Sequence, residues 1–168
     1  ESLNTFNDMH IAAICQALAE FRQDQNITGP LYMGMDTHAL SEAAFSTAVE
    51  VLAANRVSLV VQEDRGYTPT PVISHAILQH NLHHGDNSTK DQADGVVITP
   101  SHNPPEDGGF KYNPPHGGPA DSDVTNLIQQ RANEIISNDM ADVKRMSLAA
   151  AYDSAFVTEI DFSEGYID

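Results

Sequence analysis

Ser101 and His102 stand side by side in the sequence, and Lys111 follows ten residues after Ser101. Together they offer a hydroxyl, an imidazole and an ammonium group. The serine of a Ser/His/Asp hydrolase usually sits on a strand-turn-helix elbow between small residues, but Ser101 lies between Pro100 and His102. Phosphoryl transfer fits better, because it needs a nucleophile, cationic or amide donors and usually a metal ion. The residues therefore favour a serine that accepts a phosphoryl group.

The segment around Ser101, residues 99–119, is rich in proline and glycine. It holds six of the nine prolines and four of the ten glycines in the chain. This composition predicts a long irregular loop, and such loops in compact domains are usually functional. Prolines on both sides would hold the Ser101 side chain at a fixed angle. A purely structural loop explains the residues alone equally well.

Helices and strands alternate along the rest of the chain. Amphipathic periodicity and N-cap residues predict the helices, and short apolar runs predict buried strands. The predicted helices cover about residues 7–25, 41–52, 72–84 and 124–135, and the strands residues 31–35, 57–62 and 96–98. Ser41 is the expected cap of the second helix, and Asp121 or Ser122 that of the fourth. The alternation predicts an α/β layered domain with a mostly parallel sheet.

The segment with Ser101 begins where the predicted strand 96–98 ends. In α/β sheets this rim is where ligands bind. Beyond Ser137 the chain becomes acidic and less periodic, and we expect a weak helix over about residues 141–151 followed by an extended exit segment. The predicted topology and the composition thus both indicate the loop at residues 99–119 as the candidate functional segment.

The charge and length of the chain limit its function classes. It has 168 residues, and its 24 acidic and 8 basic residues give a formal charge of −16. Electrostatic repulsion argues against a nucleic acid or an anionic membrane surface as partner. No apolar run approaches the roughly 20 residues of a membrane span. We therefore expect a soluble, cytoplasmic protein, with its single cysteine, Cys15, buried on the apolar stripe of the first helix.

Four of the eight histidines lie close together on or just after the third predicted helix: His75, His80, His83 and His84. The H-E-x-x-H pattern and nearby acidic ligands are absent, so we interpret them as structural or surface residues. His38 and His116 lie in more unusual stretches and are better candidates for a site.

The run from Thr99 to Pro104 (TPSHNP), followed by residues 108–113 (GGFKYN), resembles the active-site serine loop of the alpha-D-phosphohexomutase superfamily, T-[AP]-S-H-N-P. Residues 34–41, 67–71 and 117–121 are similar to the first domain of the family's bacterial, alpha-D-glucose-specific phosphoglucomutases. The resemblance implies a three-layer α/β/α domain with a mixed, mostly parallel sheet of about four strands. It assigns residues 1–137 to this domain and residues 138–168 to a linker or exit segment toward an absent second domain.

The resemblance implies an isomerase, an intramolecular phosphotransferase that interconverts glucose 1-phosphate and glucose 6-phosphate through glucose 1,6-bisphosphate, which also serves as activator. Ser101 would carry the transferable phosphate, and an oxygen of that phosphate would bind Mg²⁺. His102 would contact the phosphate or a sugar hydroxyl. Lys111 would stabilise the phosphoryl group or act as general acid or base. Asn103, which would hold the shape of the loop, and His38 are the substrate-binding candidates.

The family's Gly-Thr-Ser-Gly-x-Arg-Gly stretch and its D-G-D-x-D-R metal cluster do not occur in this sequence. The resemblance places the remaining metal ligands and the sugar recognition in absent domains, so the isolated chain is expected to show no mutase activity. Two alternatives stay open. The chain could belong to a phosphomannomutase or phosphoglucosamine mutase, or be a non-catalytic α/β module that binds a partner through its proline-rich loop.

Overall fold

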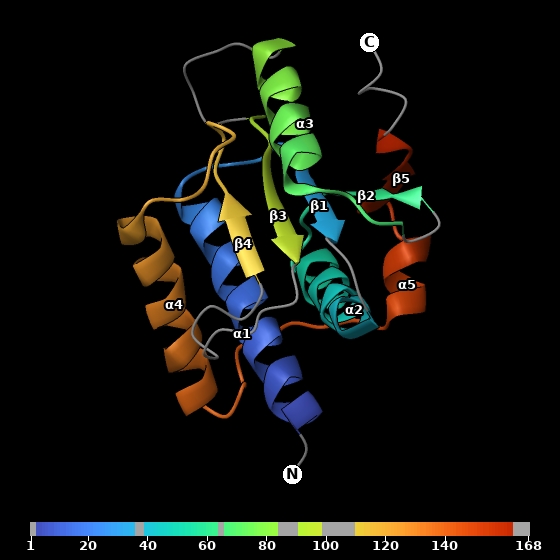
Figure 1. Ribbon diagram of the computed structural model, residues 1–168. Coiled ribbons are helices and arrows are strands. Elements are labelled where there is room, and N and C mark those ends of the chain that lie inside the picture. Colours follow the sequence, from blue (N-terminus) through green and yellow to red (C-terminus); the bar gives the residue numbers. More distant parts are fainter. Residues whose placement is uncertain (1–2, 36–38, 64–65, 84–90, 99–109, 163–168) are drawn as a thin grey trace.

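A computed structural model describes residues 3–35, 39–63, 66–83, 91–98 and 110–162 (Figure 1). The helices are α1 (Leu3–Asp24), α2 (Ala39–Ala54), α3 (Thr70–His83), α4 (Ser122–Ser137) and α5 (Leu148–Asp153). The strands are β1 (Leu31–Met35), β2 (Leu59–Gln62), β3 (Asp94–Ile98), β4 (Phe110–Asn113) and β5 (Val157–Ile160). The order confirms the predicted α/β fold, with every predicted helix and strand before residue 137 present.

The strands form one mixed sheet in the order β4-β3-β1-β2-β5. Neighbours among β1, β2, β3 and β5 pair in parallel, and β4 pairs antiparallel with β3. The sheet has five strands where about four were expected. The fifth, β5, lies in the acidic region expected to be an exit segment, and it pairs with β2 from Leu59↔Val157 to Gln62↔Ile160.

Strand β4 corrects the prediction of one long irregular loop over residues 99–119. Phe110 pairs with Ile98 and Lys111 with Val97, so residues 110–113 run back along β3 as a strand. The side chains alternate, since Lys111 is exposed and Tyr112 is buried. The strand could not be recognised in the sequence, because only four residues separate the two flanking stretches rich in proline and glycine.

Helices cover both faces of the sheet (Figure 1). On one face, Met33 and Met35 pack in a large core together with residues of α1, α2, α4 and α5. On the other, Val97 packs against Ile73 and Ile77 of α3 in a smaller cluster. This gives three layers, as expected, but with four helices on one face and one on the other.

A local signal in the sequence accounts for the start of α4. The Asp121 carboxylate accepts a hydrogen bond from the Val124 amide at 3.1 Å and caps α4, as predicted. By contrast, α2 begins at Ala39, so Ser41 lies inside the helix and is not its cap.

Cys15 is fully buried, as expected, and burial raises the pKa of its thiol. Among the described helices, none is both long and apolar enough to cross a membrane.

Candidate active site

The carboxyl ends of β1, β2 and β3 meet at one edge of the sheet, which we call the carboxyl edge. β2 lies on one side of β1 and β3 on the other, so the connections that follow β1 and β3 diverge between these two strands. A crevice at such a switch point is where open α/β sheets bind ligands. The Ser101 segment follows β3 directly in the sequence. The candidate site predicted from the sequence therefore begins at the switch point.

Lys111 is the predicted site residue that the structure describes. It is the second residue of β4, one position from the carboxyl edge, and it pairs with Val97. Its neighbour Tyr112 points toward α1, where its ring meets Phe21 edge-on at 6.0 Å. Alternation places Lys111 on the opposite face with Asn113, whose Nδ2 donates to the Ser74 hydroxyl of α3 at 3.3 Å. The exposed ammonium group is thus carried on the α3 face of the sheet.

The other predicted site residues, Ser101, His102, Asn103 and His38, lie outside the described residues. The metal ligand expected from phosphorylated Ser101 lies outside them too. Within the described ranges, His, Cys, Asp and Glu side chains form no group of three that could hold a metal ion. The structure thus places the strand ends that flank the Ser101 segment and one candidate cation, Lys111.

Gly34 allows the elements at the carboxyl edge to approach one another. A Cβ at this position would lie 2.8 Å from Cγ1 of Ile73 and 2.9 Å from the carbonyl oxygen of Thr68. Real Cβ atoms do not come so close, so only glycine lets α3 and the chain around Thr68 pack over β1. The Thr68 amide in turn donates to the Met35 carbonyl at 2.9 Å, where β1 ends. This contact fixes the segment before α3 at the edge.

The Thr68 hydroxyl is buried at this edge without a hydrogen bond to the part of the chain that the structure describes. The residue is 1% exposed, and its Oγ1 has no hydrogen-bond partner among the described residues. Such a group loses its hydration without compensation, which costs about 1–3 kcal/mol. Sequence reasoning missed it, because the TPTP run indicates a turn and gives no sign of burial.

We expect Thr68→Val to raise the free energy of unfolding of this chain by about 1 kcal/mol, because valine keeps the shape and removes the unpaired hydroxyl. Urea denaturation monitored by circular dichroism measures the change. Thr47→Val is the matched control. The Thr47 hydroxyl is also buried, but it donates to Asp8 Oδ1 at 2.6 Å, so this variant should lose stability. A Thr68→Val variant that is less stable than wild type would contradict the account.

A buried polar network joins α1, β3 and β4 at the other end of β3. Arg22 Nε donates to both carboxylate oxygens of Asp94, at 3.0 and 3.1 Å, and Tyr112 Oη donates to Oδ2 at 2.6 Å. Arg22 also donates to the Gly29 carbonyl. Burial raises the pKa of Asp94, against the effect of the Arg22 guanidinium and the Tyr112 hydroxyl. Burial beside Asp94 also raises the pKa of Tyr112. The network fixes the strand that carries Lys111.

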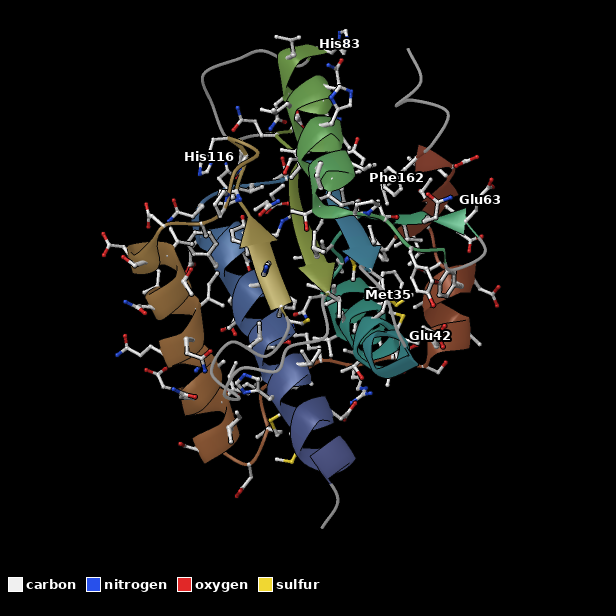
Figure 2. All side chains as sticks on the ribbon, in the orientation of Figure 1. Met35, Glu42, Glu63, His83, His116 and Phe162 are labelled. Atoms are coloured by element: carbon white, nitrogen blue, oxygen red, sulfur yellow. The ribbon has the colours of Figure 1, made fainter. Side chains whose placement is uncertain are left out.

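His83 and His116 lie away from the carboxyl edge. Figure 2 shows His83 and His116 toward the end of the molecule opposite Met35. A groove of about 350 Å³ on the α3 face is lined by His75, His80 and His83 together with aromatic and aliphatic side chains. His80 Nε2 lies 3.0 Å from the Asp91 carbonyl oxygen. His116 is therefore not part of the candidate site.

A cavity of about 610 Å³ lies beside α1, the turn after α2 and residues 142–144, and it contains none of the predicted site residues. Both of its carboxylates, Glu20 and Asp142, bind Arg131, at 3.1 and 3.4 Å. The Arg22 guanidinium at its wall pairs with Asp94. Because most of these charges compensate one another, we assign no site to this cavity despite its size.

Comparisons with known proteins agree on one family. Residues 1–139 match the family described as phosphoglucomutase/phosphomannomutase, alpha/beta/alpha domain I. The phosphoglucomutase of Komagataeibacter xylinus is 52% identical over 168 residues, which cover 99% of this chain and 30% of that protein. The chain therefore spans less than a third of this relative's length.

Two solved structures share the fold. Pp63/parafusin of Paramecium, an exocytosis-sensitive phosphoprotein and phosphoglucomutase, matches with a TM-score of 0.57 and 28% identity, over 77% of this chain and 22% of that one. A phosphomannomutase assigned in Thermus thermophilus matches with a TM-score of 0.64 over 93% of this chain and 30% of that one; at 21% identity it supports the fold alone.

Proposed function

The chain belongs to the phosphoglucomutase/phosphomannomutase family through its alpha/beta/alpha domain I, and on this premise we propose that it is the phosphoserine-bearing first domain of a phosphoglucomutase. The full-length protein would interconvert glucose 1-phosphate and glucose 6-phosphate. The observation that carries the proposal is the 52% identity to a phosphoglucomutase along 99% of the chain. The phosphohexose substrate, the further domains of the protein and a cytoplasmic location are parts of the same proposal.

In the proposed reaction, the phosphoryl group moves from the Oγ atom of Ser101 to the 6-hydroxyl of glucose 1-phosphate. The P–Oγ bond breaks, a P–O6 bond forms, and the hydroxyl proton is left for the serine oxygen. After the bisphosphate reorients, the P–O1 bond breaks, a P–Oγ bond forms on Ser101, the serine proton passes to O1, and glucose 6-phosphate leaves. The same phosphoserine is regenerated, so the cycle needs no net phosphate donor, and glucose 1,6-bisphosphate would restore it when it is lost.

Charge on the transferred group decides what the remaining residues do. Negative charge lies on the phosphoryl oxygens throughout the transfer, and fixed cations or N–H groups stabilise it. Lys111, exposed beside the carboxyl edge, is suited to this role. His102 would contact the phosphate or a sugar hydroxyl, and Asn103 and His38 would contact the substrate.

Phosphoserine oxygen is a hard donor of the kind Mg²⁺ prefers, and bound Mg²⁺ would neutralise part of the phosphoryl charge. Because the described residues offer no group of three metal-binding side chains, phosphorylated Ser101 is the one ligand that we assign to this chain. The remaining ligands would come from a different part of the protein.

We expect Lys111→Met in the full-length protein to lower kcat for glucose 1-phosphate by about 10²-fold, the usual effect of removing one charge-stabilising donor. Methionine keeps the length of the side chain and removes the charge. The rate is measured as glucose 6-phosphate formed, in the presence of Mg²⁺ and a trace of glucose 1,6-bisphosphate.

Lys144→Met is the control, because Lys144 is also exposed but lies beside the cavity at α1, away from Lys111. An equal loss in both variants would point to a general charge effect and count against the role of Lys111. Mannose 1-phosphate and glucosamine 1-phosphate as substrates test the related mutases. A wild-type protein that turns over none of the three sugars would leave the non-catalytic module as the better explanation.

A further inference from the structure

Residues 66–69 cross the carboxyl end of β1 on the way from β2 to α3, and we call them the crossing segment. Hydrogen bonds fix its backbone. The Thr68 amide donates to the Met35 carbonyl at 2.9 Å, and the Val72 amide donates to the Pro69 carbonyl at 3.0 Å. Pro69 also restricts its own φ angle and the backbone of Thr68. The crossing segment is therefore a rigid part of the carboxyl edge.

The crossing segment lies next to the end of β3, where residues 99–109, here called the serine segment, begin. Met35, which accepts its hydrogen bond, pairs with Ile98 in the parallel ladder between β1 and β3. Ile98 is the last residue of β3 before the TPSHNP run. Adjacent strands lie about 4.8 Å apart, so the crossing segment sits roughly one strand spacing from the point where that run leaves the sheet.

Tyr67 is the exposed aromatic residue of the crossing segment. Tyr67 is 55% exposed, and its ring makes no aromatic contact with the described part of the chain. On either side of it, Gly66 is half-buried and Thr68 is buried. A large aromatic ring is thus held in water at the ligand-binding edge by a backbone that is already fixed. Such a ring loses little freedom when a ligand covers it.

Tyr67 suits one kind of ligand group in particular. A tyrosine presents an apolar ring and a polar hydroxyl together, and a pyranose presents apolar C–H faces with hydroxyls around the rim. Lys111 and the serine segment account for the phosphoryl groups of the proposed substrate, and the Tyr67 ring offers an apolar surface to its sugar ring. Ligand sites usually combine aromatic walls with a few polar groups.

We propose that Tyr67 contacts the sugar ring of the phosphohexose and helps to orient it at the carboxyl edge. The inference rests on the proposed function and goes beyond it, because it assigns part of the hexose recognition to this first domain. The contact is with the ring and not with the phosphate, so it should affect binding of glucose 1-phosphate more than the phosphoryl transfer itself.

The test compares Tyr67→Ala, Tyr67→Phe and wild type in the full-length protein, with kcat and KM measured for glucose 1-phosphate. Tyr67→Ala should raise KM about 10-fold, the effect of losing one aromatic contact, and leave kcat within about twofold. Tyr67→Phe keeps the ring and should stay close to wild type. Leu82→Ala is the control, because Leu82 is 73% exposed near the far end of α3 and should change neither constant.

Each other result would overturn the proposal. An unchanged KM in Tyr67→Ala, with an active wild-type protein, would rule out the sugar contact. It would leave the proposed mutase function standing. An equal loss in Tyr67→Phe would assign the effect to the hydroxyl. A lowered Tm of the full-length Tyr67→Ala protein together with the raised KM would show that Tyr67 packs against another domain. A wild-type protein without mutase activity would overturn the proposed function and this inference together.

Discussion

Ser101→Ala in the full-length protein is expected to lower kcat for glucose 1-phosphate by at least about 10⁴-fold, because a methyl group cannot accept the phosphoryl group. The KM has no meaning for such a variant, so a second measurement is needed. After incubation with glucose 1,6-bisphosphate, intact-mass spectrometry should find one added phosphate on the wild type and none on Ser101→Ala. Both results follow from a single nucleophile at the end of β3.

Ser58→Ala is the matched control for this experiment. Ser58 is an exposed serine that directly precedes β2 at the opposite edge of the sheet. The control should keep both the added phosphate and the turnover. A phosphate that persists in Ser101→Ala would place the nucleophile elsewhere and refute the assignment of the serine segment.

Asp94→Ala is expected to lower the free energy of unfolding of this chain by about 3–5 kcal/mol, because it leaves a buried guanidinium without its counter-charge. Asp94 is 0% and Arg22 4% exposed, so solvent cannot replace the lost carboxylate. The loss also leaves the Tyr112 hydroxyl without its acceptor. Urea denaturation of the purified 168-residue chain measures the effect.

Two further variants keep this prediction testable if Asp94→Ala fails to fold. Tyr112→Phe removes one hydrogen bond and retains the ion pair, so it should cost about 1–2 kcal/mol. Glu20→Ala breaks a pair with Arg131 in which both side chains are about one-third exposed, at 36% and 34%, and should cost less than about 1 kcal/mol. Similar losses in Asp94→Ala and Glu20→Ala would contradict the role of the buried network.

The sequence predicts the fold well wherever apolar spacing decides it. The stripe that contains Cys15 becomes the buried face of α1, and the run at residues 31–35 becomes the central strand β1. The failures have a common physical cause. In β4 only Tyr112 and Asn113 are buried, and four residues between prolines and glycines give too short a pattern. β5 is exposed along its middle residues and adds to the sheet through backbone pairing with β2.

The sequence alone suggests a chemistry for the candidate site, but it does not indicate the residues from other parts of the fold that support it. Ser101 and Lys111 stand out by type and by their neighbours in the sequence. The network of Arg22 with Asp94 joins residues 72 positions apart, and neither residue differs locally from an ordinary surface charge. The burial of Thr68 could not be predicted for a similar reason, because only the packing of α3 over Gly34 shows that its hydroxyl is buried.

The antiparallel pairing of β3 with β4 has a consequence for how the serine segment can change. The two residues that flank this segment, Ile98 and Phe110, are partners in one ladder. Their Cα atoms lie about 5 Å apart. Residues 99–109 can therefore gain or lose residues without shifting Lys111 against Val97, because the ladder and not the loop sets that register. The position of Lys111 is thus independent of the length of the serine segment.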